Sequence, residues 1–240
     1  LRVWGDKMAE LIVGLDISEK QNAKALVEQL GSAVDFYKIG SIPFTAFGPE
    51  IINKLSTSGK KVFLDLKFFD IPNTVEKSVE CACGMAVACL TVHILGGSAM
   101  LKAAVRAKNR VNAGTKIIGV TMLTSFSNQD IQEIGFSMDI NKQILKLAEV
   151  GYDNGLDGIV CSVWELGLLR KKFRQPFLMV CPGIRMQISS DDQKRAATVS
   201  QAIKAGADWI VVGRPVIESK NPLVVVEQIK REIKEHETTK

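Results

Sequence analysis

The sequence has few of the residues that build metal centres and disulfide frameworks. It contains two histidines, His93 and His236, and five cysteines, none of which form a Cys-x-x-Cys pair. An odd number of cysteines argues against a complete disulfide framework, and a zinc site needs Cys and His ligands at short spacing. We therefore expect reduced thiols in a cytoplasmic protein, and no metal centre.

Long apolar runs and basic blocks are also missing. No stretch approaches the roughly 20 apolar residues that cross a bilayer, and the start of the chain has no signal-peptide core. The 31 Lys and Arg are spread along the chain, without the interleaved aromatic residues of a nucleic-acid surface. We therefore expect neither membrane nor nucleic-acid binding, although the net charge of +5 suits an anionic ligand.

The composition is that of an ordinary globular protein with a sizeable core. The chain has 240 residues, of which 46% are hydrophobic and 24% are charged. It begins on Leu1, and Met8 is a possible natural start. We expect residues 1–8 to be an N-terminal extension and residues 9–240 to form a single catalytic domain.

Short runs rich in Val, Ile and Leu alternate with amphipathic stretches. The expected strands are residues 11–16, 36–40, 61–66, 89–94, 116–121, 158–161, 177–180 and 209–212. Helices are expected over residues 19–31, 47–58, 72–84, 98–108, 141–155, 164–173 and 192–205, and in a last stretch ending near residue 235. Continuous apolar runs are typical of a parallel sheet buried on both faces. Eight strand–helix units in about 230 residues predict a single-domain α/β fold, the (β/α)8 TIM barrel.

An open, doubly wound sheet is the alternative architecture. Such a sheet is expected to carry a glycine-rich turn after its first strand. The turn here reads Asp16-Ile17-Ser18-Glu19 and contains no glycine. This favours the barrel, in which the active site forms at the carboxyl ends of the strands.

Charged side chains gather at these expected strand ends. Asp16 and Lys38 belong to the first two strands, while Asp65, Lys67 and Asp70 lie in and after the third. Alternation puts Asp65 and Lys67 on one face of their strand, where burial is costly unless they pair. If Asp65 and Lys67 are considered without the other charged residues, a structural ion pair is enough to explain them. The full alternating set predicts a catalytic centre, because neighbouring carboxylates keep Lys67 charged in a dry site.

Glycine and arginine follow each of the last two expected strands. Arg185 ends the sequence Pro-Gly-Ile-Arg, and Gly213 and Arg214 stand together after the final strand. Barrels often bind phosphate in these two loops, where glycine admits close backbone approach and arginine matches phosphate oxygens. The alternative is a turn glycine beside a solvated arginine in each loop. Because glycine and arginine occur together in both loops, a phosphate site is favoured. Thr124 and Gln193 are neutral hydrogen-bonding candidates on flanking loops.

The stretch Asp65-Leu-Lys67-Phe-Phe-Asp70-Ile-Pro-Asn-Thr74 resembles the signature of the orotidine 5'-phosphate decarboxylase family, especially its bacterial form. Similar landmarks follow in order along nearly the whole chain, at residues 14–16, 37–40, 120–125, 158–162, 182–185, 192–193 and 212–215. The resemblance implies a homodimeric barrel that needs no metal or organic cofactor. Its expected reaction converts orotidine 5'-monophosphate to UMP and CO2 in pyrimidine biosynthesis.

The resemblance also implies a role for each candidate residue. Lys67 would donate the proton, and Asp65 would lie beside the substrate carboxylate. Asp16 and Lys38 would hold the ribose hydroxyls and join the charge network. Asp70 and Thr74 would reach the partner's site, and Thr124 would mark the segment that contacts the base. The phosphate side would consist of Arg185, Gln193, Gly213 and Arg214.

Two departures and two alternatives accompany this interpretation. Phe69 stands where close relatives often have histidine, and Ile94-Leu95 replaces a smaller pair. A metal-dependent sugar-phosphate decarboxylase or aldolase of related barrels shares the Asp-x-Lys-x-x-Asp core and is the alternative enzyme. A barrel kept only for nucleotide binding or interaction is the alternative outside catalysis.

Overall fold

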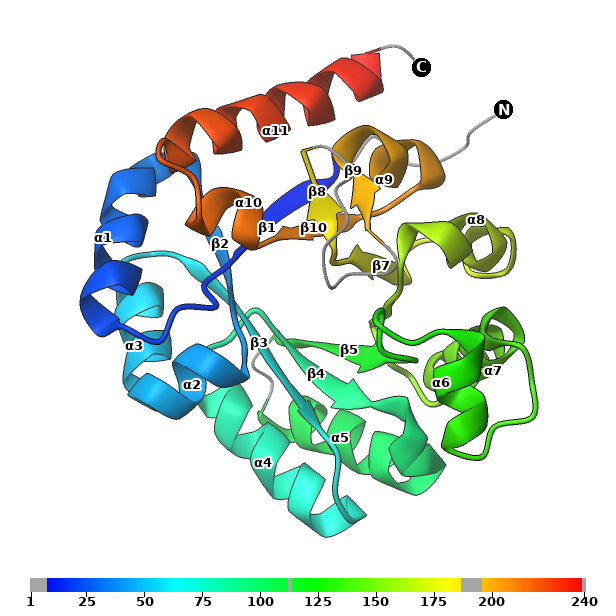
Figure 1. Ribbon diagram of the computed structural model, residues 1–240. Helices are drawn as coiled ribbons and strands as arrows, with labels where there is room; N and C mark the ends of the chain where they lie inside the picture. The colour runs from blue at the N-terminus through cyan, green and yellow to red at the C-terminus, as the bar shows by residue number, and fades with distance from the viewer. Residues whose placement is uncertain (1–7, 112–113, 187–195, 239–240) are drawn as a thin grey trace.

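A computed structural model describes residues 8–111, 114–186 and 196–238. In this part of the chain, eight parallel strands close into a barrel in the order β1-β10-β7-β6-β5-β4-β3-β2 (Figure 1). They are β1 (Glu10–Gly14), β2 (Phe36–Ile39), β3 (Lys61–Phe68), β4 (Cys89–His93), β5 (Lys116–Val120), β6 (Gly158–Val160), β7 (Leu178–Cys181) and β10 (Trp209–Val212). The predicted barrel is confirmed. The doubly wound sheet is wrong, because β1 pairs with β10 and closes the ring.

Helices cover the outside of the barrel (Figure 1). They are α1 (Lys20–Leu30), α2 (Ser41–Phe47), α3 (Glu50–Thr57), α4 (Pro72–Gly84), α5 (Gly97–Val111), α7 (Ile140–Asp153), α8 (Val163–Lys172), α9 (Val199–Ala205) and α11 (Pro222–Thr238). Short 3-10 turns, η1 (Gly31–Ala33) and η2 (Ile94–Gly96), follow α1 and β4. The expected helix over residues 47–58 is wrong in extent. Gly48, at φ 62°, ends α2, and α3 starts after Pro49.

Besides α2 and the two 3-10 turns, three small elements have no counterpart among the expected ones. They are α6 (Asn128–Glu133), α10 (Arg214–Ile217) and a two-stranded sheet of β8 (Ile184–Arg185) and β9 (Ala197–Thr198). The first, α6, lies between the expected strand at residues 116–121 and the expected helix at residues 141–155. Ser127 and Asp130 form a reciprocal capping box there, in which each side chain accepts a hydrogen bond from the other's backbone N–H.

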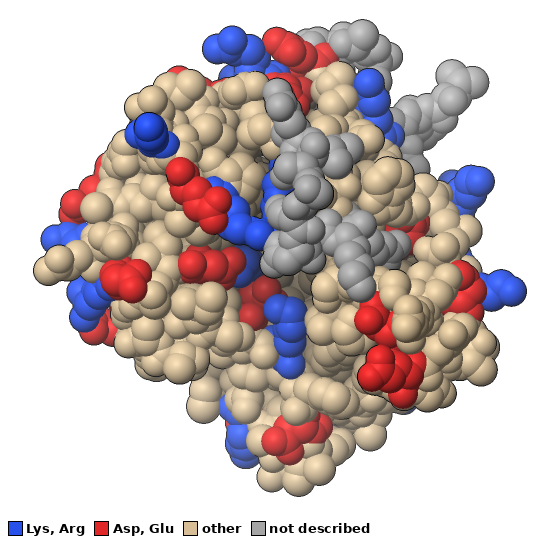
Figure 2. Space-filling view, in the orientation of Figure 1, with Lys and Arg blue, Asp and Glu red and all other residues tan. Residues whose placement is uncertain are grey.

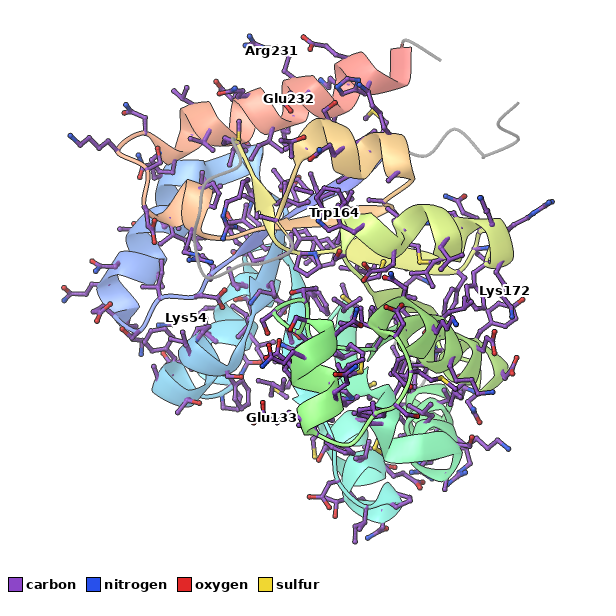
Figure 3. All side chains as sticks on the ribbon, turned by 45° about the vertical axis from the view of Figure 1, so that its right-hand side comes forward. Lys54, Glu133, Trp164, Lys172, Arg231 and Glu232 are labelled. Atoms are coloured by element: carbon purple, nitrogen blue, oxygen red, sulfur yellow. The ribbon has the colours of Figure 1, made fainter. Side chains whose placement is uncertain are left out.

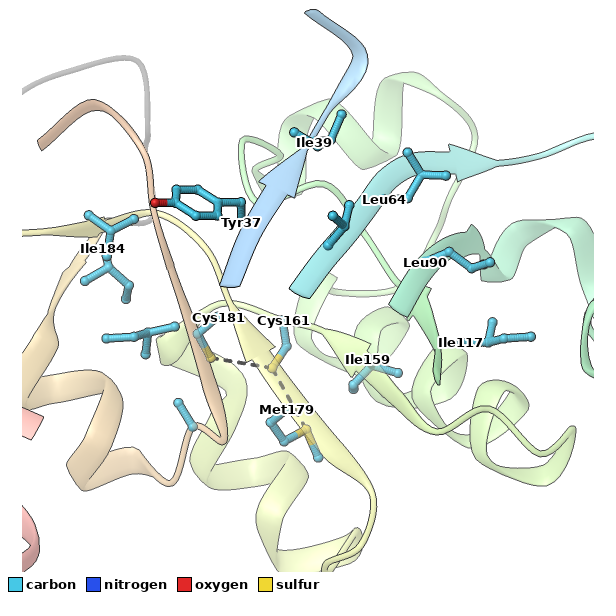
Figure 4. Close-up of a cluster of buried hydrophobic side chains, with 14 of the residues drawn as sticks. Tyr37, Ile39, Leu64, Leu90, Ile117, Ile159, Cys161, Met179, Cys181 and Ile184 are labelled. Carbon is cyan, nitrogen blue, oxygen red and sulfur yellow. Dashed lines mark hydrogen bonds between the residues drawn. The ribbon is translucent and has the colours of Figure 1, made fainter. Parts of the chain in front are cut away.

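The apolar side chains form two layers separated by the strands. Inside the barrel, the closely packed residues are Ile12, Phe36, Phe63, Cys89, Ile118, Val180, Trp209 and Val211. The larger layer fills the space between strands and helices, and Figure 4 shows part of it around Tyr37, Leu64 and Cys161. Successive side chains of each strand point alternately into the barrel and towards the helices. Because both faces of the strands are buried, the strands read as continuous apolar runs.

The outer surface carries most of the charge. Side chains such as Lys54, Lys172 and Arg231 project outward from the surrounding helices (Figure 3).

All five cysteines are free, although the Cys161 and Cys181 sulfurs lie 4.0 Å apart (Figure 4). Within the three described ranges, no helix has the length and apolar character needed to span a membrane. The proposed extension falls outside these ranges except for Met8, so the division at residue 8 stays a prediction.

Candidate active site

A cavity of about 310 Å³ opens at the carboxyl ends of the barrel strands. Its walls include eight of the side chains or glycines singled out from the sequence: Asp16, Lys38, Asp65, Lys67, Thr124, Arg185, Gly213 and Arg214. Charged atoms of both signs surround the hollow in the middle of this face (Figure 2). The barrel topology explains the gathering, because parallel strands end at one rim.

Four charges of alternating sign run across three neighbouring strands. The Lys38 ammonium lies 2.8 Å from Asp16 Oδ1 and 3.9 Å from Asp65 Oδ2. Lys67 Nζ in turn lies 3.0 Å from both carboxylate oxygens of Asp65. Lys38 and Asp65 are largely buried, and each has an opposite charge beside it, which offsets the cost of removing it from water. The structure therefore assembles the predicted charge network, apart from Asp70.

Lys67 ends this chain of charges in an unusual backbone conformation. Its φ is 50°, in the left-handed region that residues with a side chain rarely adopt. The pairing of β3 with β4 also shifts register between Leu64 and Phe68. Strain of this kind persists where the surrounding structure enforces it, and it concentrates at functional sites.

The arginines of the predicted phosphate side lie at the same cavity. Arg185 belongs to β8 and is 8% exposed, and Arg214 starts α10 directly after Gly213. Thr124 lies in the loop after β5 and also lines the cavity. Gln193 lies outside the described residues, so its assignment stays a prediction.

Asp70 and Thr74 are not among the residues that line this cavity. Both are exposed, and Asp70 Oδ1 accepts a hydrogen bond of 2.6 Å from the N–H of Ile71. Phe69 and Ile71 on either side are 59% and 66% exposed. The chain thus turns this part of the motif away from its own cavity, and the predicted contact with a partner's site remains a prediction.

His93 packs beside the charge network without joining it. Its ring lies 5.4 Å from that of Phe69, and its Nδ1 accepts a hydrogen bond from the Leu95 N–H at 3.4 Å. Burial and then the charge of Lys67 lower the pKa of His93. Among the residues that the structure describes, no three Asp, Glu, His or Cys side chains are grouped like metal ligands.

Sequence reasoning missed the apolar walls of the site and the buried threonine beside Asp65. Apolar walls come from Val120, Met122, Val160 and Val180, and Thr91 is fully buried beside Asp65. Threonine and valine are ordinary strand residues, so their identity alone gives no functional signal.

A family model described as "Orotidine 5'-phosphate decarboxylase / HUMPS family" matches residues 9–229. The chain belongs to this family. It is 40% identical to an orotidine 5'-phosphate decarboxylase of Hahella chejuensis, over 93% of this chain and 96% of that protein. Identity to the decarboxylase of Coxiella burnetii is 39%, over 94% and 97% of the two chains.

The decarboxylase-family fold is also found among solved structures. The crystal structure of orotidine 5'-phosphate decarboxylase from Lactobacillus acidophilus superposes with a TM-score of 0.83 at 35% identity, covering 94% of this chain and 99% of that one. The family match over residues 9–229 includes every strand that closes the barrel.

Proposed function

We propose that this protein decarboxylates orotidine 5'-monophosphate to UMP and CO2, a step of pyrimidine biosynthesis. The observation that carries the proposal is the alternating chain Asp16–Lys38–Asp65–Lys67 in a cavity that also holds two arginines. Relatives about 40% identical over nearly their full length carry the name of this enzyme, which supports the choice of substrate. The protein is accordingly a carboxy-lyase.

The chemical difficulty lies in the carbanion that remains when CO2 leaves the pyrimidine ring. In the proposed mechanism, Lys67 stabilises this charge and then donates a proton from Nζ to the same carbon. An ammonium about 4 Å from a unit negative charge contributes about 4 kcal/mol at an effective dielectric constant near 20. That energy corresponds to roughly three decades in rate.

Asp65 has two proposed roles beside Lys67. Its carboxylate holds the ammonium at 3.0 Å, which keeps the proton donor aimed at the cavity. A substrate carboxylate placed next to Asp65 would also be repelled in the ground state, and the repulsion ends when CO2 departs. Asp16 and Lys38 are proposed to hold the ribose hydroxyls. The Asp16 carboxylate can accept hydrogen bonds from these hydroxyls, and the Lys38 ammonium can donate hydrogen bonds to them.

The non-reacting phosphate supplies binding energy at a distance from the chemistry. Arg185 and Arg214 are proposed to bind it, with Gly213 and Gln193 contributing to the same side. Guanidinium groups suit this task because they donate paired hydrogen bonds to phosphate oxygens. Thr124 is proposed to mark the loop segment that contacts the base.

We further propose a homodimer in which Asp70 and Thr74 enter the partner's cavity. The exposed apolar side chains of Phe69 and Ile71 flank Asp70, and neighbouring exposed apolar residues are a feature of interaction sites. The proposed location is the cytoplasm, since all five cysteines are free and that compartment keeps thiols reduced.

Loss of orotidine 5'-monophosphate absorbance, followed with and without a metal chelator, tests the proposed reaction. We expect turnover that the chelator does not change. Turnover of a sugar phosphate that stops on chelation would instead establish the metal-dependent alternative. No turnover of either substrate by folded protein would favour the nucleotide-binding alternative.

A further inference from the structure

The two strands that carry the catalytic lysine and His93 do not pair evenly. Leu64 pairs with Leu90, and Phe68 pairs with Val92. Between these pairs, β3 holds Asp65, Leu66 and Lys67, whereas β4 holds one residue, Thr91. A bulge of this kind interrupts the ladder of backbone hydrogen bonds, so the displaced backbone groups need other partners.

The hydroxyl of Thr91 supplies the missing partner. It accepts a hydrogen bond of 2.8 Å from the backbone N–H of Lys67 and donates one of 3.0 Å to Asp65 Oδ1. One hydroxyl can do both, since it has a single proton and free lone pairs. Thr91 is 0% exposed, so water cannot readily replace either bond.

These two bonds fix both members of the central ion pair. The first holds Lys67 at the point where its φ is 50°, and the second orients the carboxylate that lies 3.0 Å from Lys67 Nζ. A left-handed conformation at a lysine relaxes unless its surroundings determine it. Thr91 therefore connects the backbone conformation of Lys67 with the direction in which its ammonium points.

We propose that Thr91 is a positioning residue of the decarboxylation, acting through Lys67 and Asp65; this inference rests on the proposed function. Thr91 is not among the side chains that line the cavity, so it does not touch the substrate. Its removal is expected to lower kcat and to leave KM nearly unchanged, because the phosphate and ribose contacts remain.

The variants Thr91→Val and Thr91→Ser separate the hydroxyl from the shape of the side chain. Valine keeps the branched shape and removes both hydrogen bonds, and serine keeps the hydroxyl. We expect Thr91→Val to lose about 100-fold in kcat, the size of effect caused by a misplacement of about 1 Å, and Thr91→Ser to regain most of it. Thr115→Val is the matched control, because Thr115 is also buried but donates to the Val87 carbonyl, away from the cavity.

A second measurement does not depend on turnover. Hydrogen exchange at the Lys67 amide should speed up in Thr91→Val, remain slow in Thr91→Ser, and be unaffected by Thr115→Val. If valine at position 91 prevents folding, Thr91→Ala takes its place in both measurements. An unchanged kcat together with unchanged exchange would overturn the proposal, as would an equal loss of kcat in Thr115→Val.

The same experiment distinguishes this proposal from the proposed function. Wild-type protein that exchanges slowly at Lys67 but does not decarboxylate orotidine 5'-monophosphate would refute the reaction and, with it, any role of Thr91 in that reaction. Active wild-type protein with an unaffected Thr91→Val variant would refute the positioning role alone.

Discussion

Lys67 combines a charge, a strained backbone and two short contacts to one carboxylate. We predict that Lys67→Ala lowers kcat for orotidine 5'-monophosphate by at least about 10³-fold, because it removes both the proton donor and the charge that stabilises the carbanion. Steady-state assays of purified protein measure the loss. Lys54→Ala, which changes an exposed lysine of α3, is the control (Figure 3). Near-normal turnover in Lys67→Ala would refute the mechanism.

Arg214 should act on binding and not on the reacting carbon. We predict that Arg214→Ala raises KM for orotidine 5'-monophosphate about 10- to 100-fold, the loss expected for a charge-assisted hydrogen bond of about 1.5–3 kcal/mol. Turnover of orotidine, which has no phosphate, should be nearly the same in variant and wild type. Arg231→Ala on α11 is the matched surface control (Figure 3). The phosphate assignment fails if KM does not change.

His93 should make stability depend on pH. Burial and the Lys67 charge lower its pKa in the folded protein, whereas the unfolded chain keeps the ordinary value. As the pH falls through about 6.5, the unfolded state binds a proton that the folded state resists, so folding becomes less favourable.

We therefore predict that the wild type loses more stability than His93→Asn between about pH 7 and about pH 5. Asparagine offers an oxygen that can accept the Leu95 N–H but does not titrate. Urea unfolding at both pH values measures the difference. Parallel pH dependence in the two proteins would show that His93 is not the group responsible.

At the scale of elements, the strand pairing of β6 with β7 depends on the absence of a side chain. Gly158 pairs with Leu178, and a Cβ on Gly158 would lie 2.4 Å from the Leu178 carbonyl oxygen. Backbone atoms cannot move aside as a flexible side chain does. This part of the barrel therefore requires glycine for reasons of space.

We predict that Gly158→Ala destabilises the protein by about 1–3 kcal/mol, the usual cost of overpacking. Gly167→Ala is the matched control, because Gly167 lies within α8 and a Cβ there would meet no atom within 4 Å. Alanine at position 167 should stabilise the helix by about 0.5–1 kcal/mol. Urea unfolding decides, and equal effects of the two substitutions would contradict the packing argument.

At the scale of the whole molecule, the motif that begins at Asp65 is divided between two directions. Asp65 and Lys67 point into the cavity of their own chain, while Asp70 and Thr74 lie outside it. If a partner completes each site, two inactive chains can complement one another. Closed twofold dimers place the same contribution in both sites.

We predict that Lys67→Ala and Asp70→Ala chains are each impaired and that equal mixing restores about a quarter of wild-type activity, because half of the dimers are mixed and each has one intact site. Activity is measured after the two proteins are unfolded and refolded together. Each variant refolded alone is the control. No recovery in samples with proven mixed dimers would refute the shared site.

The sequence by itself determined the architecture and most of the charged rim. Apolar runs of strand length predict strands that are buried on both faces. Four charged residues follow or end such runs, which places them at one end of a barrel: Asp16, Lys38, Asp65 and Arg214. These are local signals, since they depend on residues a few positions apart. They also carried the family resemblance, which the comparisons confirmed.

Only the tertiary structure decided the neutral and conformational parts of the site. Thr91 lies opposite a register shift between β3 and β4, and the left-handed backbone of Lys67 lies within that shift. Both depend on which residues of a neighbouring strand stand opposite, 24 positions away in the chain for Thr91 and Lys67. Strand alternation cannot reveal such pairing, because register is set by packing between segments and not by the order of residues within one.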